Sequence, residues 1–440
     1  MTDTIILGAG LTGLATAYYL EKSGSTDYQI FEKENEIGGL CRSIRQDGFT
    51  FDYTGHLLHI NNPDFRALLE DVMPFSSLNF LHRKSRIFNH NTYTHYPFQT
   101  NLYGLPTSII AECIEGFIKR KKIKNPKTFY SWALTHFGKG FTQHFFNPYQ
   151  RKIFCHDPKK FTATWTGRFV PQTSLESIIE GALKKPNDSI GYNASFYYPK
   201  NGGIDHLVHA IAQKLKNKIK TACEVETIDL KKKCVYFSNG YHTHYNKLIT
   251  TIPLNQFLQK ITDKSTTSLS TQSRHLKVNS VLNINLGINR PNIEDYHWCY
   301  FPEKQFPFYR AGFSHHFSKK MAPHDTSALY IEHSYMNNKK ISTSTLINHA
   351  TSFLGIKNSD IITRIQLHIP HAYVIYNAWR DKNLSSIFAR LTENNIYSIG
   401  RYGAWKYSSM QESVIDGKQI VETMLHRWEQ KKEKEVVLPK

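Results

Sequence analysis

The pattern of apolar and polar positions is clearest in residues 1–60 of the chain. Residues 4–7 form a short apolar run that predicts a strand, and residues 14–22 carry apolar side chains at helical spacing. Residues 28–32 predict a second strand, which ends in an acid. We therefore expect a strand, a turn, a helix and a second strand, in the order of a βαβ unit.

A glycine-rich turn joins the first predicted strand to the helix. Residues 8–13 read Gly-Ala-Gly-Leu-Thr-Gly, and an acid follows by about 20 residues, as dinucleotide-binding units require. The first glycine permits the tight turn, the second lets a pyrophosphate approach the backbone, and the third lets helix and strand pack closely. Free N–H groups at the helix start bind phosphates, and the acid binds a ribose. The predicted cofactor contacts are Gly8, Gly10, Leu11, Thr12, Gly13 and Glu32.

A second glycine pair indicates which dinucleotide is bound. Residues 38–43 read Gly-Gly-Leu-Cys-Arg-Ser, and residues 51–56 read Phe-Asp-Tyr-Thr-Gly-His. Alone, the pair would be an ordinary turn. After the first motif, it resembles the second FAD contact of the large flavoprotein family that contains amine oxidases, protoporphyrinogen oxidases and UDP-galactopyranose mutases. A plain NAD enzyme would not need it, so we expect FAD. The predicted contacts here are Gly38, Gly39, Leu40, Arg42, Gly55 and His56.

Apolar periodicity divides the rest of the chain into helical and strand-rich stretches. It predicts helices at 63–72, 107–119, 127–138, 140–154 and 173–184, and strands within 83–95, 222–237, 247–253, 277–287, 327–335 and 395–401. We expect an α/β fold: a discontinuous Rossmann-type FAD-binding domain (1–60, 186–275 and 390–428), a helical insertion domain (103–185) and an antiparallel β-sheet substrate domain (75–102 and 276–389). A helix over 413–428 should precede a charged tail of low order at 429–440.

Composition narrows the classes of function. The formal charge of the 440-residue chain is +19, with basic tracts at 119–122 and 231–233, but no nucleic-acid-binding motif accompanies them. We interpret the charge as a solvated surface that would also attract an anionic substrate, and we leave peripheral membrane association and a homo-oligomer open. The six cysteines show no metal-ligand spacing, so we expect no metal and reduced thiols in a cytoplasmic protein. No stretch approaches the ~18–20 apolar residues of a membrane span.

Several segments, in order, resemble the UDP-galactopyranose mutase family, in particular its eukaryotic-type branch. The resemblance runs from Ile5 to about Val421. Its segments are residues 96–101 (YPFQTN), 147–152 (NPYQRK), 165–171 (WTGRFVP), 298–303 (WCYFPE), 307–310 (PFYR) and 400–407 (GRYGAWKY). The resemblance implies a reaction that is non-redox overall: N5 of reduced FAD attacks the anomeric carbon of a nucleotide sugar, NDP leaves, and pyranose and furanose rings interconvert. Such a reaction serves surface polysaccharide synthesis, and NAD(P)H is a candidate reductant.

The resemblance also implies roles for individual residues. Arg168 and Arg310 would clamp the pyrophosphate of a UDP-sugar, because guanidinium groups offer paired donors to phosphate oxygens. His56 would lie beside the flavin and respond to its redox state. The substrate-binding residues implied are Tyr96, Phe98, Gln99, Gln150, Phe154, Tyr300, Tyr373 and Tyr407. The further cofactor-binding residues implied are Val225, Gly400, Arg401, Met410 and Gln411.

Three positions depart from the family pattern. The family has Gly-Gly-His where this chain has Thr54-Gly55-His56, and the uridine-side asparagine and tryptophan correspond to Gln150 and Phe154. The eukaryotic-type asparagine after the final tyrosine is absent from residues 408–410. The diphosphate site is therefore kept, while the pattern leaves open an NDP-sugar other than UDP-galactose.

Two other functions remain open at this point. The glycine motifs fit equally an oxidase or dehydrogenase of the amine-oxidase or protoporphyrinogen-oxidase type. A flavin-bound protein with a scaffold role is suggested only by the net charge. Arginines at 168 and 310 facing one cleft would favour the mutase, because an amine or a porphyrinogen needs no pyrophosphate clamp.

Overall fold

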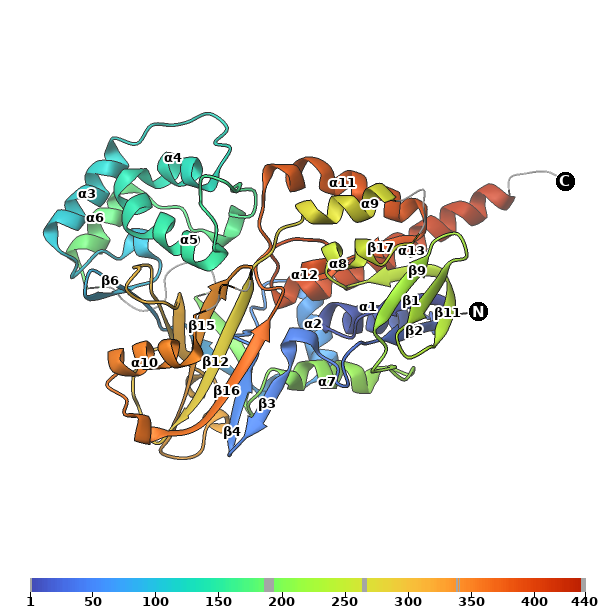
Figure 1. Ribbon diagram of the computed structural model, residues 1–440, viewed down its shortest axis with the longest axis horizontal. Coiled ribbons are helices and arrows are strands. Elements are labelled where there is room, and N and C mark those ends of the chain that lie inside the picture. Colours follow the sequence, from blue (N-terminus) through green and yellow to red (C-terminus); the bar gives the residue numbers. More distant parts are fainter. Residues whose placement is uncertain (1, 186–193, 263–266, 338, 340, 437–440) are drawn as a thin grey trace.

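The computed structural model describes residues 2–185, 194–262, 267–337, 339 and 341–436 (Figure 1). Its first sheet is assembled from distant parts of the chain. β1 (Thr2–Leu7) pairs in parallel with β2 (Tyr28–Phe31) on one side and β11 (His242–Thr250) on the other, and β17 (Ile396–Ser398) pairs in parallel with β11. The predicted βαβ unit is confirmed, and the mixed α/β fold class with it.

Two antiparallel strands extend this sheet at the side of β11. β9 (Val225–Asp229) and β10 (Cys234–Phe237) form a hairpin that pairs with the first half of β11. The short helices α8 (Leu254–Gln259) and α9 (Thr267–Gln272), together with α11 (Ala378–Glu393), follow in the chain and pack on the neighbouring core. Strand β1 is apolar because both faces of the sheet are covered: Ile5, Ile6 and Leu7 are fully buried.

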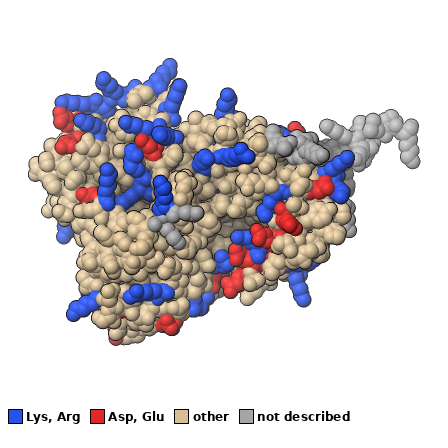
Figure 2. All heavy atoms as spheres, viewed as in Figure 1, with Lys and Arg blue, Asp and Glu red and all other residues tan. Residues whose placement is uncertain are grey.

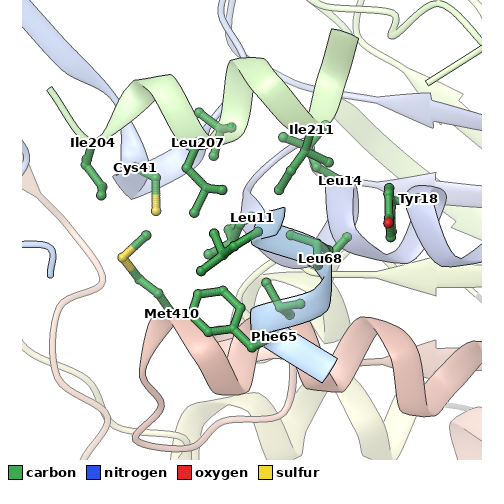
Figure 3. Packing of buried hydrophobic residues seen from close by; sticks show 14 of the residues in the cluster. Leu11, Leu14, Tyr18, Cys41, Phe65, Leu68, Ile204, Leu207, Ile211 and Met410 are labelled. Carbon is green, nitrogen blue, oxygen red and sulfur yellow. The ribbon is translucent and has the colours of Figure 1, made fainter. Parts of the chain in front are cut away.

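Four helices pack together on the other face of the sheet. They are α1 (Leu11–Lys22), α2 (Pro63–Val72), α7 (Asp205–Lys214) and α13 (Met410–Val436). Figure 3 shows side chains from all four pointing into one cluster, with Leu11 and Leu14 of α1 between Phe65, Leu207 and Met410. The cluster fixes the start of α1, where the glycine-rich turn ends.

The second sheet has seven strands in the order β16-β12-β15-β14-β13-β6-β7. All neighbours are antiparallel except β13 and β6, which run parallel. The strands are β6 (Ser85–Asn89), β7 (Thr92–His95), β12 (Ser280–Ile288), β13 (Trp298–Tyr300), β14 (Arg310–Phe313), β15 (Ser327–Tyr335) and β16 (Ile361–Ile369). Helix α10 (Thr343–Phe353) packs on this sheet through its buried leucine and isoleucine side chains.

A helical part lies between the two sheets in sequence and at one end of the molecule in space (Figure 1). It holds α3 (Thr107–Ile118), α4 (Phe129–Phe141), α5 (Asn147–Phe154) and α6 (Leu175–Leu183). Thr128 caps the start of α4, since its hydroxyl accepts the backbone N–H of Ser131. The helix continues to Phe141 across a break at Gly138, where the sequence predicted an end.

The remaining elements are short. Strands β3 (Ser43–Gln46) and β4 (Phe49–Asp52) form one hairpin, and β5 (Leu78–His82) pairs with β8 (Ser195–Pro199). Helix α12 (Gly400–Gly403) follows β17. Among the described residues, no helix is both long and apolar enough to cross a bilayer.

One predicted element was wrong. The tail at 429–440 was expected to have little order after a helix over 413–428, yet α13 begins at Met410 and continues to Val436, and residues 437–440 lie outside the described residues. Residues 429–435 are Glu, Gln and Lys, which have strong helix propensity, and no proline or glycine occurs up to residue 436, so this stretch extends the helix. The proposed domain bounds themselves stay a prediction.

Candidate active site

A cavity of about 980 Å³ runs between the two sheets and collects residues from every part of the chain. One end lies at the glycine-rich turn and the other beneath the seven-stranded sheet. The predicted cofactor residues on its wall are Gly8, Gly10, Leu11, Thr12, Glu32, Gly38, Gly39, Leu40, Arg42, Gly55, His56, Val225, Gly400, Arg401 and Met410. The predicted substrate and catalytic residues on its wall are Tyr96, Tyr300, Tyr373, Tyr407, Arg310 and His56.

The two glycine motifs lie directly against each other at one end of the cavity. Gly38 donates its N–H to the carbonyl of Ala9 at 2.8 Å, and Gly10 and Gly38 form an isolated parallel bridge. A Cβ atom on Gly39 would lie 3.3 Å from the Cα of Gly10, and Gly39 has a φ of +58°. This approach leaves a strip of bare backbone where a pyrophosphate can lie.

Gly13 acts behind the cavity rather than on its wall. A Cβ atom there would come within 1.9 Å of the carbonyl oxygen of Gly8, so only glycine lets α1 pack so close to the turn. The role predicted for this glycine in packing has a direct structural basis. Gly10 stands at the N-cap of α1 without any side chain capping the helix, which leaves the first N–H groups of α1 directed at the cavity end.

Glu32, at the end of β2, is held by the backbone on both sides. One carboxylate oxygen accepts the N–H of Ala9 at 2.7 Å, and the other accepts the N–H of Glu34 at 3.0 Å. The side chain is buried and borders the cavity. Each oxygen keeps a lone pair for a ribose hydroxyl. The glycine strip, the uncapped helix start and this acid together fit the pyrophosphate and ribose of FAD.

The other end of the cavity carries arginines and tyrosines. Arg310 begins β14, and its Nε and Nη2 atoms each donate to Glu332 of β15 at 2.7 Å, across a cross-strand pair. Glu332 is fully buried, and although burial opposes charge on Arg310, Glu332 holds the pKa of the guanidinium well above its usual value. The pair leaves the Nη1 nitrogen for a ligand and fixes the plane of the guanidinium.

Arg401 lies at the same end, on α12. It donates to the carbonyls of Ser408 at 2.6 Å and Ala372 at 3.2 Å, and its guanidinium lies 4.9 Å from the ring centroid of Tyr407. Its guanidinium is also 5.8 Å from the ring of Tyr373. Burial raises the pKa of Tyr373 well above its usual value and outweighs the opposing influence of Arg310, so this tyrosine is a neutral donor between two cations.

His56 lies between the two ends. Burial, followed by the positive charges of Arg401 and Arg310, lowers the pKa of His56 to about 4. The imidazole is therefore neutral at pH 7 and adds no positive charge to the arginine end.

Besides Gly13, five predicted residues among those described do not line the cavity. Phe98 stacks on Phe145 inside the helical core with ring centroids 5.0 Å apart, and the Gln99 amide donates to the carbonyl of Pro171 at 2.6 Å. Phe154 is buried behind Tyr373, and Gln150 is buried with no partner for its amide oxygen among the described residues. Gln411 accepts the N–H groups of residues 61 and 62, which ties α13 to the start of α2.

The predicted roles of these five residues in binding stay predictions. Arg168 belongs to the short 3₁₀ helix η5 (Gly167–Phe169), and its side chain lies outside the described residues. Its neighbour Phe169 does reach the cavity wall, and its ring lies 4.6 Å from that of Tyr407. The predicted meeting of arginines 168 and 310 across one cleft therefore also stays a prediction.

Sequence reasoning missed several residues of the site. Arg83 lines the cavity with its guanidinium 4.6 Å from the ring of Tyr96, and Tyr309 shares a hydrogen bond of 3.3 Å with the hydroxyl of Tyr373. Glu332 and Lys152 act from behind the wall. Lys152 donates to three carbonyls of residues 301–308 and so holds the connection between β13 and β14.

Comparison with known proteins places the chain among flavin-dependent enzymes. The family model described as "flavin containing amine oxidoreductase" matches residues 11–373. Among curated proteins, protoporphyrinogen oxidase 2 of Arabidopsis thaliana is 25% identical over 195 residues. That stretch covers 41% of this chain and only 38% of the Arabidopsis protein.

Solved structures match over nearly the whole chain. A structure of reduced UDP-galactopyranose mutase superposes with a TM-score of 0.90 at 26% identity, covering 97% of this chain and 96% of that one. A proposed protoporphyrinogen oxidase from Exiguobacterium sp. 255-15 superposes with a TM-score of 0.76 at 16% identity, covering 96% and 98%. The second likeness establishes the fold alone.

Proposed function

Because the chain belongs to the family of flavin-containing amine oxidoreductases, we propose that it binds FAD and acts as an NDP-sugar pyranose–furanose mutase. The observation that carries this proposal is Arg310, fixed by Glu332 and facing the same cavity end as Arg401 and three tyrosines. The likeness to reduced UDP-galactopyranose mutase along the full chain supports it as well. We place the reaction in surface polysaccharide synthesis in the cytoplasm.

The charge distribution along the cavity supports an anionic substrate. The acids on its wall are Glu32, Glu34 and Glu224, which stand at the ends of β2 and β9, beside the nucleotide turn. The tyrosine end has arginines at 83, 310 and 401 and no acid on the wall among the described residues. A diphosphate would find cations there, whereas a protonated amine would be repelled.

The residues of this end would divide the work on a nucleotide sugar. Arg310 would bind the diphosphate through its Nη1 nitrogen and stabilise the charge that grows on NDP as it leaves. The hydroxyls of Tyr300, Tyr373 and Tyr407 would donate to the other phosphate oxygens, because a phenol O–H is a hydrogen-bond donor. Reduced flavin, when bound, would supply the nucleophilic N5 atom for the anomeric carbon.

Redox dependence tests the proposal directly. Protein reduced with dithionite is incubated with a panel of NDP-sugars, and the products are separated by chromatography. We expect the furanose and pyranose forms to interconvert only after the protein is reduced, with no net consumption of reductant. NAD(P)H is tested in the same way as the candidate physiological reductant. The oxidised protein and the corresponding sugar 1-phosphates are the controls.

The same experiment tests the rival function. An oxidase or dehydrogenase of the amine-oxidase or protoporphyrinogen-oxidase type would consume oxygen or another electron acceptor in proportion to the substrate converted. Stoichiometric oxygen uptake with an amine or a porphyrinogen, combined with no NDP-sugar conversion by the reduced protein, would replace the mutase by this rival.

A further inference from the structure

The helical part of the molecule carries an unusual share of the exposed apolar side chains. Of the twelve large hydrophobic residues that are exposed among the described residues, six lie between positions 103 and 183. They are Tyr103, Ile118, Ile123, Leu175, Ile179 and Leu183. We call these six residues the apolar face. None of them lines the cavity, so the active site does not explain their exposure.

The apolar face follows from how α6 packs. Leu175, Ile179 and Leu183 recur at every fourth position, so they share one side of α6, while Ile178 faces the core and is fully buried. The backbone N–H groups of residues 102 and 103 both donate to the carbonyl of Gly181, which places Tyr103 beside the end of α6. Leu183 is the most exposed of the set, at 74%.

Helix α3 contributes the neighbouring part of the face. Its other side packs on α4 so closely that a Cβ on Gly116 would lie 2.7 Å from the backbone nitrogen of Gly140. Ile118, at the end of α3, points away from that contact and is 59% exposed. Helices α3 and α6 contact each other, so the exposed side chains of both belong to one neighbourhood of the helical part.

Positive charge surrounds the apolar face. The connection after α3 carries Lys119, Arg120, Lys121, Lys122, Lys124 and Lys127, and the chain has no Asp or Glu between Glu115 and Asp157. Figure 2 shows Lys and Arg side chains gathered over this region, at the upper left. Two of the four acids on α3 and α6 pair with a lysine: Glu115 with Lys119, and Glu180 with Lys184 at 3.4 Å.

From this combination we infer that the apolar face and its basic border dock the protein onto the surface of an anionic lipid bilayer. Apolar side chains flanked by lysines are what an interfacial segment needs, because the side chains enter the headgroup region while the lysines meet anionic lipids. Because the border of the apolar face is basic, an anionic bilayer complements its charge and an uncharged bilayer does not. The contact is peripheral and leaves the cavity, which lies in another part of the molecule, open to a dissolved nucleotide sugar.

Vesicle flotation with the full flavin-loaded chain tests the inference. We expect the protein to float with vesicles of phosphatidylcholine containing one-quarter phosphatidylglycerol and to stay behind with pure phosphatidylcholine. Each lysine near an anionic surface is worth about fivefold in partitioning, so Lys121→Gln, Lys122→Gln and Lys124→Gln together should weaken binding roughly 100-fold. The matched control is Lys231→Gln, Lys232→Gln and Lys233→Gln, which removes the same charge at the β9–β10 turn and should leave binding unchanged.

The apolar part has its own pair of variants. Ile179→Ser with Leu183→Ser should weaken binding to the anionic vesicles several-fold, while Ile362→Ser, at a 47% exposed position on β16, should not. The inference is overturned if wild type does not bind the anionic vesicles, or if both lysine triples weaken binding equally. It is also overturned if the wild type is a dimer by light scattering that the Ile179/Leu183 variant dissociates, because the face would then be a contact between copies.

Discussion

The two ends of the cavity are built in different ways. At the nucleotide end, Gly8, Gly10 and Glu32 come from one βαβ unit, and bare backbone forms much of the cavity wall. At the tyrosine end, Arg310 and Arg401 come from separate elements, β14 and α12, and side chains form the wall. The first end is therefore determined by local geometry, whereas the second depends on long-range packing. Substitutions should accordingly damage cofactor binding at one end and substrate binding at the other.

The largest effect is expected for Gly13→Val. The new Cβ would lie 1.9 Å from the carbonyl oxygen of Gly8, so α1 must separate from the turn that binds the cofactor. We expect the loss of bound flavin, measured by absorbance of the purified protein, together with a lower midpoint of thermal unfolding.

Variants of two further glycines distinguish a loss of cofactor binding from misfolding. Gly39→Ala meets the Cα of Gly10 at 3.3 Å and requires an unfavourable φ of +58°, so it should weaken FAD affinity in a protein that still folds. Gly167→Ala meets no atom within 4 Å and is the control. Full flavin content in both the Gly13 and the Gly39 variants would show that the glycine strip does not bind the cofactor.

The next effect concerns Arg310 and its partner. Arg310→Ala should weaken UDP binding by roughly 1.5–3 kcal/mol, the value of hydrogen bonds to a charged group. Turnover should fall further, because charge grows on the leaving group. The variant also leaves the carboxylate of Glu332 buried without its cation, which costs about 3–5 kcal/mol of folding free energy. UDP titration followed by flavin absorbance, with denaturant unfolding, measures both quantities.

A double variant distinguishes the two roles of Arg310. Arg310→Ala with Glu332→Gln removes the buried charge, so it should regain stability but not UDP affinity. Arg310→Lys should recover binding only in part, because lysine lacks the planar fork. Arg45→Ala, which breaks an ion pair with Asp205 outside the cavity, is the matched control and should change stability alone. Normal UDP affinity in the double variant would remove the main support for a sugar-nucleotide substrate.

The two ends also differ in how well the sequence predicts them. The turn at residues 8–13 and Glu32 were predicted from motif and spacing, because both belong to one continuous βαβ unit in which the acid follows the turn by about 20 residues. Glu332 was missed, although an acid directly after the apolar run 328–331, in the middle of a predicted strand over 327–335, signals a buried partner. That partner, Arg310, could only be found once the register of β14 and β15 was known.

Other misses have the same physical origin. Lys152 stands in the 147–152 motif with no role assigned to it, yet it donates to three carbonyls of a loop far along the chain. The family resemblance implied Phe98 and Gln99 as substrate-binding residues, and that role stays a prediction although neither side chain lines the cavity. Tyr96 lies on the cavity wall, whereas the side chains of Phe98 and Gln99, after the turn at Pro97, are buried in the core. Whether neighbouring side chains point into the cavity or into the core is decided by packing, and the composition of the segment does not reveal it.

The smallest effect is expected at His56, where the two ends meet. Its pKa is lowered to about 4 by burial and by Arg401 and Arg310, against about 6.5 in the unfolded chain. The unfolded state therefore binds more protons between pH 6.5 and 4, so this group contributes no penalty above pH 6.5 and destabilises the fold progressively as the pH falls through that window. Between pH 6.5 and 5.5, His56 alone should lower the free energy of unfolding by about 1 kcal/mol, because a full pH unit is worth ~1.4 kcal/mol.

The variant His56→Asn lacks this titrating group, so the free energy of unfolding of the variant should fall less steeply with acid than that of wild type. Denaturant unfolding at saturating FAD, repeated from pH 7 to pH 5, measures the difference, and His324→Asn at an exposed surface position is the control. Identical slopes in wild type and His56→Asn would mean that His56 does not feel the charge of the arginine end, and the boundary between the two ends would have to be placed elsewhere.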